Sequence, residues 1–264
     1  MPVARNGNVE LNYEVHGDGE PLLLLQGLGY GIWGWWKQIR DLSRDHRLIV
    51  FDNRGVGGSS KVTEPYTVDD MADDAAAVLD AAGADSAYVA GISLGGLIAQ
   101  SLAARYPDKV RRLVLISTTH GGPEAVPVPP ETAAIMLDPG EDLTPEQKIR
   151  RNMPPAFRPG WVEAHPDEFD EIVALRVGNI PPWDAYVAQA TAGGTADTTG
   201  LIGKIGAPTL IVHGTEDRVV PFGNAELLAS KIAGAKVEVL SGAGHVVMIE
   251  EPDRLHGLIR GFCR

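Results

Sequence analysis

Three polar residues, Ser93, Asp217 and His245, each follow a short apolar run that reads as a β-strand. A serine hydroxyl is a weak nucleophile and needs an adjacent base, which a histidine imidazole can supply. A carboxylate beside that imidazole fixes its tautomer and stabilises the imidazolium that forms when the serine proton moves. The carboxyl ends of parallel strands meet at one edge of a sheet, where ligands bind in open α/β folds. These residue types therefore predict acyl transfer, with Ser93 as nucleophile, His245 as base and Asp217 as a candidate for the acid that orients it.

Ser93 is the central residue of Gly91-Ile92-Ser93-Leu94-Gly95, between a predicted strand at 88–90 and a predicted helix from about 95 onward. A serine at the tip of a sharp turn needs neighbours without bulky side chains, which Gly91 and Gly95 provide. The turn also places Ser93 at a helix N-terminus, where free N–H groups and the helix dipole favour negative charge. The pentapeptide therefore predicts a G-x-S-x-G nucleophile elbow.

Acyl transfer also needs two preset N–H donors that stabilise the oxyanion of the tetrahedral intermediate. One should be the backbone N–H of Leu94, directly after the nucleophile. The other should come from the loop Gln26-Gly27-Leu28-Gly29, which follows the apolar run Leu22–Leu25. We expect Leu28 to be that second donor, through its backbone and not its side chain.

Two neighbouring residues offer alternatives for the acid and the base. Glu216 precedes Asp217 and could be the acid. His213 directly follows a predicted strand and could be the base, although a histidine that ends a buried strand is more often packed structure. The residues alone leave the acid open between Glu216 and Asp217.

Seven apolar or alternating runs read as the strands that must position these residues. The first alternates with period two, as a half-buried strand does, and the others read as buried strands. Helical patterns lie between most of them, including one that Thr67 can cap and a last one with Leu255 and Ile259 on one face. Strands and helices that alternate in this way predict a parallel sheet with helices on both faces. The strand candidates are Val9–Val15, Leu22–Leu25, Arg47–Phe51, Ala87–Ala90, Leu113–Ile116, Thr209–Val212 and Val237–Leu240.

One long interval, from Thr118 to about Ile205, contains no clear buried strand but 12 of the 19 prolines. Unstructured loops of such length are uncommon in compact domains, so the interval predicts an inserted helical lid. We expect a core domain of residues 1–118 and 206–264 with a helical cap at 119–205. Its aromatic residues could line an apolar substrate pocket or only pack the lid onto the core; they are Phe157, Trp161, Phe169, Trp183 and Tyr186.

The net charge of −12 makes binding to nucleic acid or to an anionic membrane surface a poor expectation. Cys263 is the single cysteine, so no internal disulfide can form and the fold does not require an oxidising compartment. The opening residues run straight into polar sequence without an apolar signal core. These features predict a cytoplasmic protein.

A glycine-rich loop offers a competing function. Gly29-Tyr30-Gly31-Ile32-Trp33-Gly34 is a literal G-x-G-x-x-G, and Asp52 ends the next strand about twenty residues on, as in dinucleotide-binding folds. However, the first glycine lies several residues past the strand, and tryptophans crowd the turn where a pyrophosphate would need space. We therefore interpret it as a chance match and expect no cofactor; the sequence also carries no metal-binding motif.

Together these motifs resemble the α/β-hydrolase superfamily over nearly the whole chain outside the lid. Asp52-Asn53-Arg54-Gly55-Val56-Gly57-Gly58-Ser59 is similar to the family's D-x-R-G-x-G-x-S segment, and residues 202–213 and 242–252 resemble its acid and histidine segments. The resemblance implies a mostly parallel eight-stranded sheet, the chain order Ser, Asp, His, and Asp217 as the acid. Most members carry His-Gly where this chain has Gln26-Gly27, which leaves the branch open.

The N-terminal half is similar to the enol-lactonase, bacterial perhydrolase/haloperoxidase and carbon–carbon-bond hydrolase branches. A serine at position 93 argues against haloalkane dehalogenases and epoxide hydrolases, whose nucleophile is an aspartate. We expect a serine hydrolase that cleaves a small, fairly apolar carboxylic ester or lactone through an acyl-enzyme. Its expected partner is this small-molecule substrate, and the sequence leaves the oligomeric state open. Perhydrolysis and C–C cleavage use the same triad and stay open, as does a non-catalytic protein that uses the pocket to bind a ligand.

Overall fold

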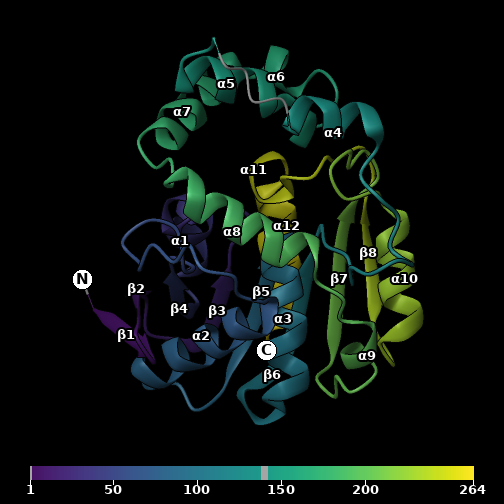
Figure 1. Ribbon diagram of the computed structural model, residues 1–264. Helices are drawn as coiled ribbons and strands as arrows, with labels where there is room; N and C mark the ends of the chain where they lie inside the picture. Colours follow the sequence, from purple (N-terminus) through teal and green to yellow (C-terminus); the bar gives the residue numbers. More distant parts are fainter. Residues whose placement is uncertain (1, 138–141) are drawn as a thin grey trace.

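The computed structural model describes residues 2–137 and 142–264. Its core is an eight-stranded sheet with the strand order β1-β2-β4-β3-β5-β6-β7-β8 (Figure 1). β2 is antiparallel to both of its neighbours, and all other neighbouring pairs are parallel. The strands are β1 (Val3–Asn6), β2 (Val9–His16), β3 (Glu20–Leu25), β4 (His46–Phe51), β5 (Ala87–Ile92), β6 (Val110–Ile116), β7 (Thr209–Gly214) and β8 (Lys236–Leu240).

Helices cover both faces of this sheet, and successive strand residues contribute to opposite cores. In β3, Leu23 and Leu25 pack in the core that includes α2 and α3, whereas Leu22 and Leu24 pack in the core that includes α1 and α12. A strand buried on both faces needs apolar side chains at every position, which explains the unbroken apolar runs. The predicted parallel sheet between two helical layers is confirmed. These helices are α1 (Trp36–Leu42), α2 (Val68–Ala81), α3 (Leu94–Arg105), α10 (Gly223–Lys231), α11 (Val247–Glu250) and α12 (Pro252–Phe262), with short 3₁₀ helices η1 (Ile32–Trp35) and η2 (Pro107–Lys109).

A local sequence signal places the start of α2 as predicted. Thr67 accepts a hydrogen bond from the backbone N–H of Asp70, and the Asp70 carboxylate accepts one from the backbone N–H of Thr67. This reciprocal capping box satisfies two N–H groups that the helix leaves without partners. In α12, the predicted apolar stripe is also confirmed, with Leu255 and Ile259 buried.

The two edges of the sheet differ from the predictions. β1 was not predicted, because four residues with only Ala4 buried carry almost no apolar period. Val237–Leu240 was predicted as a buried strand but forms the opposite edge, where Val239 is 43% exposed. An edge strand has a neighbour on one side only, so its β-branched residues need not be buried.

Between β6 and β7 the described residues form helices and one isolated bridge, Gly121–Asp197, as the lid prediction required. Figure 1 shows α4–α7 beyond the end of the sheet toward which β7 and β8 point. Residues 138–141 of the predicted lid lie outside the described residues, and the division into two domains stays a prediction. We refer to residues 119–205 as the insertion; its helices are α4 (Pro130–Leu137), α5 (Pro145–Asn152), η3 (Pro154–Ala156), α6 (Trp161–Ala164), α7 (Pro166–Val177), α8 (Trp183–Gly194) and α9 (Thr199–Ile202).

The aromatic residues of the insertion mostly pack it onto the core. Phe157 and Trp161 stack at 4.5 Å between ring centroids, and Phe169 meets Phe157 edge-on at 5.9 Å. All three are buried in the core that includes α1 and α12. Trp183, in contrast, is 69% exposed. The inference of an apolar substrate from these aromatic residues therefore loses most of its support. Among the described helices, none is long and apolar enough to cross a bilayer.

Candidate active site

Ser93 occupies a strained turn between β5 and α3. Its backbone has φ 54° and ψ −120°, a conformation rare for a residue with a side chain. The Ser93 N–H donates to the Ile116 carbonyl at 3.0 Å, and the Ser93 carbonyl accepts from Thr118 Oγ1 at 2.7 Å and Gly96 N at 2.8 Å. Such a conformation persists only where the surroundings over-determine it, as these bonds to β6 and its following loop do.

The two elbow glycines are explained by close backbone approach. A Cβ atom on Gly95 would lie 2.1 Å from the Leu25 carbonyl oxygen, and one on Gly91 would lie 2.2 Å from the Gly95 carbonyl oxygen. Both distances are far inside van der Waals contact with backbone that has no room to move. The spacing of the pentapeptide therefore reflects the packing of α3 against β3 and β5.

Gly95→Ala should destabilise the protein by about 1–3 kcal/mol, because the added methyl group collides with β3. Gly257→Ala is the matched control, since a Cβ on this glycine of α12 meets no atom within 4 Å. There alanine should stabilise the helix by roughly 0.5–1 kcal/mol. Denaturant unfolding of the two variants measures both effects, and equal free energies of unfolding would contradict the close approach at the elbow.

Asp217 and His245 meet beyond the carboxyl ends of β7 and β8. Asp217 Oδ2 lies 2.9 Å from His245 Nδ1, and Asp217 Oδ1 accepts from the backbone N–H groups of Val219 and Val220 at 2.9 and 2.8 Å. The Asp217 carboxylate is fully buried, and burial by itself would raise its pKa. The opposing charges and hydrogen bonds of His245 and His213 outweigh burial and lower the pKa of Asp217 well below its usual range. An ionised carboxylate thus faces the imidazole.

His213 and Glu216, the alternatives for the base and the acid, differ in their contacts from the pair of Asp217 and His245. His213 is fully buried, and its Nε2 lies 2.8 Å from the Val220 carbonyl and 3.2 Å from Asp217 Oδ2. A carbonyl oxygen can only accept, so Nε2 carries the hydrogen and His213 is a packed donor to the acid. Glu216 is exposed and, within the described residues, bonds to neither histidine. Sequence inspection missed that Asp217 serves two histidines, although His213 and Asp217 are only four residues apart.

The insertion contacts the loop that carries His245. The backbone N–H of His245 donates to the Ala156 carbonyl at 2.9 Å. The Glu250 carboxylate accepts from the backbone N–H groups of Gly244 and Arg158, each at 3.2 Å, and so joins this loop to the insertion. Burial raises the pKa of Glu250 despite these donors. None of these contacts was predicted from the sequence.

The loop after β3 lies against the serine. A Cβ atom on Gly27 would be 3.4 Å from Ser93 Cβ. In this loop the N–H of Gly27 donates to Gln26 Oε1, that of Gly29 to Gln189 Oε1 at 2.6 Å, and that of Tyr30 to the Gly27 carbonyl.

The N–H groups of Leu28 and Leu94, in contrast, have no hydrogen-bond acceptor among residues 2–137 and 142–264. These are the two donors expected from the sequence. Leu94 directly follows Ser93, and Leu28 directly follows Gly27, at which an added Cβ atom would touch Ser93.

Gln26 stands where the resemblance expects histidine. It is buried, its Oε1 accepts from Gly27 N at 2.9 Å, and its carbonyl accepts from Asn53 Nδ2 at 3.2 Å. The side chain therefore folds back on its own loop and leaves the N–H of Leu28 unoccupied.

The dinucleotide alternative finds no support at its acidic residue. The Asp52 carboxylate accepts from the N–H groups of Ile32 and Gly58 and from Asn12 Nδ2, each at 2.8 Å. Tyr30 and Trp33 stack at 4.8 Å between ring centroids in the glycine-rich loop itself. The Asp52 carboxylate is thus already engaged by hydrogen bonds within the protein. Across the described parts of the chain, no group of three or more His, Cys, Asp and Glu side chains has the arrangement of a metal site.

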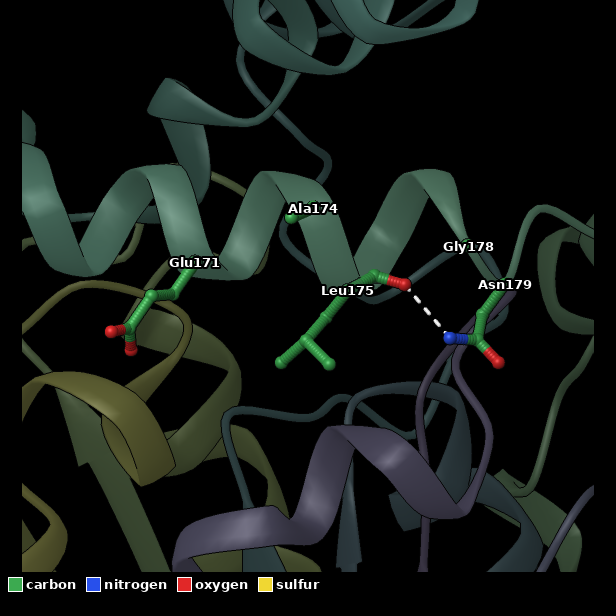
Figure 2. A pocket seen from close by; sticks show the side chains of 5 residues that line it. All are labelled: Glu171, Ala174, Leu175, Gly178 and Asn179. Atoms are coloured by element: carbon green, nitrogen blue, oxygen red, sulfur yellow. Dashed lines mark hydrogen bonds between the residues drawn. The ribbon is translucent and has the colours of Figure 1, made fainter.

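A cavity of about 540 Å³ lies beside the insertion helix α7. Glu171, Leu175 and Asn179 project from this helix and its end on one side, and Asn179 Nδ2 donates to the Leu175 carbonyl at 2.8 Å (Figure 2). This hollow is open to solvent over most of its extent, unlike the concave clefts that bury small molecules. Its lining includes none of Ser93, Asp217 and His245, so this hollow does not mark the reacting centre.

Several known proteins are similar to this chain over nearly its whole length. A protein of Azorhizobium caulinodans, RutD, provisionally assigned as a carbamate hydrolase, is 31% identical over 100% of this chain and 98% of its own. The 3-oxoadipate enol-lactonase 2 of Acinetobacter baylyi is 29% identical over 97% of this chain and 94% of its own. The solved structure of Est816, an N-acyl homoserine lactone degrading enzyme, is 30% identical with a TM-score of 0.82 over 99% of this chain and 100% of that chain. The family described as alpha/beta hydrolase fold matches residues 20–252, and the chain belongs to this family.

Proposed function

We propose that the protein hydrolyses carboxylic esters or lactones through an acyl-enzyme on Ser93, with His245 as base and Asp217 as the orienting acid. The observation that carries the proposal is the buried 2.9 Å contact between Asp217 Oδ2 and His245 Nδ1. With Nδ1 donating to the carboxylate, Nε2 of the neutral ring is the nitrogen free to accept a proton. Ser93 directly follows β5, which runs parallel to β7 and β8, so its hydroxyl belongs to the same edge of the sheet as His245 and is the one to which we assign this proton.

The reaction then runs in two acyl-transfer steps. Ser93 Oγ forms a bond to the carbonyl carbon of the substrate while its proton passes to His245 Nε2, and the carbonyl oxygen becomes an oxyanion. The N–H groups of Leu28 and Leu94 stabilise that oxyanion. The C–O bond to the leaving alcohol breaks as His245 gives that proton to the alcohol oxygen. Water then attacks the acyl carbon while His245 takes its proton, and the bond to Ser93 Oγ breaks as His245 returns that proton to Oγ.

Two relatives support an ester or lactone substrate, since one is named an enol-lactonase and the other an enzyme that degrades an N-acyl homoserine lactone. RutD is named as a carbamate hydrolase, and a carbamate also contains a carbonyl carbon. The substrates named for these three relatives could all be attacked at a carbonyl carbon by one serine nucleophile. Pocket detail, which decides between such substrates, differs within a shared fold.

A substrate screen tests the proposal. Chromogenic esters of graded acyl length, simple lactones, N-acyl homoserine lactones and, with added hydrogen peroxide, peracid formation should be compared in wild type and Ser93→Ala. We expect Ser93-dependent hydrolysis of at least one ester or lactone. Peracid formation without hydrolysis would reassign the protein to perhydrolysis. The absence of any turnover by folded wild type would contradict the proposal and favour a ligand-binding role.

A further inference from the structure

The peptide groups on both sides of Gly29 are held by the insertion. The Gly29 N–H donates to Gln189 Oε1 of α8 at 2.6 Å, and the Gly29 carbonyl accepts from Arg176 Nη1 of α7. Gly29 has φ 68°, the left-handed region that favours glycine, and a Cβ there would lie 2.8 Å from Arg176 Nη2. Two side chains more than a hundred residues away along the chain thus fix one residue of the loop after β3.

Both of these side chains are themselves anchored. Gln189 is fully buried, and its Nε2 donates to the Arg54 carbonyl at 3.1 Å. The Arg176 guanidinium lies over the Tyr30 ring at 4.5 Å from its centroid and at 6.0 Å from that of Trp33. Burial raises the pKa of the Tyr30 phenol although Arg176 opposes the shift, so the ring stays neutral and offers its face to the cation.

The fixed residue adjoins the expected oxyanion donor. Leu28 and Gly29 share a peptide bond, so the orientation of the Gly29 peptide groups limits the rotation of the Leu28 backbone. The turn is closed by Tyr30 N–H, which donates to the Gly27 carbonyl at 3.2 Å. Donors that are held before the reaction need no reorganisation when the oxyanion forms.

We propose that Arg176 and Gln189 are positioning residues, which hold Gly29 from both sides so that the Leu28 N–H stays preset for the oxyanion above Ser93. The inference rests on the proposed function and deepens it, because it makes the insertion part of the catalytic apparatus. In this arrangement α7 and α8 cannot move away from the core without releasing the loop after β3. Neither side chain needs to touch the substrate.

Arg176→Met and Gln189→Met test the proposal, since methionine approximates the size of each side chain but removes its hydrogen bonds. With a chromogenic ester that wild type hydrolyses, each variant should lose about 10- to 100-fold in kcat, as small misplacements of catalytic groups do, with little change in KM. Inhibition by a trifluoromethyl ketone, which forms a tetrahedral oxyanion adduct with serine, should weaken by a similar factor. Arg176→Lys keeps a charged donor and should recover part of the loss.

Arg150→Met is the matched control, because Arg150 also lies on the insertion but pairs with Glu146 and Asp170 at the surface. It should retain wild-type kcat and inhibition. Thermal unfolding identifies variants that do not fold; if Arg176→Met is one of them, Gln189→Met and Arg176→Lys decide the outcome. Wild-type kcat in folded Gln189→Met and Arg176→Met, or a loss confined to KM, would overturn the positioning role. Persistent activity in Ser93→Ala would instead overturn the proposed function itself.

Discussion

Replacing Ser93 by alanine should lower kcat for ester or lactone hydrolysis by about 10⁶-fold, the loss seen when a serine nucleophile is removed. The physical reason is that alanine offers no atom on which the acyl group can be carried. Residual turnover should be limited to what substrate binding and the Leu28 and Leu94 N–H groups give without a nucleophile. Steady-state rates with the best substrate of the screen provide the measurement.

Ser230→Ala is the control for this substitution, because Ser230 is exposed on α10 and its hydroxyl donates to the Leu227 carbonyl of the same helix. Its rates should match those of wild type. Ser93→Ala should also keep the wild-type fold, since the Ser93 hydroxyl itself forms no hydrogen bond among the described residues. A folded Ser93→Ala variant with near-normal rates would remove Ser93 from the reaction.

Asp217→Asn should lower kcat by about 10⁴-fold, because an amide N–H₂ facing His245 Nδ1 favours the wrong tautomer of the imidazole. Glu216→Gln should leave the rate within a few-fold of wild type, since its side chain is exposed to solvent. The comparison is direct because the two residues are neighbours in the chain and both substitutions remove one negative charge. The reverse ranking would move the acid to Glu216.

Asp217→Asn should also change how the stability of the protein depends on pH. The pKa of Asp217 is lowered in the folded protein, so its contribution is complete above the unfolded value of about 4 and is lost as the pH falls toward the folded value. An asparagine does not titrate. The difference in free energy of unfolding between wild type and Asp217→Asn should therefore narrow as the pH decreases below about 4. A difference independent of pH would contradict an ionised, histidine-paired Asp217.

The parallel sheet and the elbow could be predicted because their signals are local. Buried strands such as Leu22–Leu25 need an apolar residue at every position, and Gly91 is required by a close approach to the Gly95 carbonyl that the turn itself creates. Short or exposed edge strands carry no such signal, which is why β1 was missed and the burial of Val237–Leu240 was predicted wrongly.

Long-range contacts of the insertion could not be predicted. Arg176 and Gly29 are 147 residues apart, and Gln189 and Gly29 are 160 apart, so no spacing rule links them. The choice between Asp217 and Glu216 likewise depends on which side chain is buried against His245. Aromatic composition could not decide between a pocket lining and core packing, and Phe157 is one of the residues that pack into the core.

Covalent labelling tests the central claim most directly. Wild type, Ser93→Ala and His245→Ala should be treated with a fluorophosphonate, which reacts with an activated serine, and the adduct located by peptide mass spectrometry. Because Ser93, His245 and Asp217 are assigned to one catalytic site, we expect one adduct per wild-type chain, on the peptide that contains Ser93. We expect no adduct in Ser93→Ala and much slower labelling in His245→Ala. Equal labelling of Ser93→Ala, or an adduct on another residue of wild type, would contradict it.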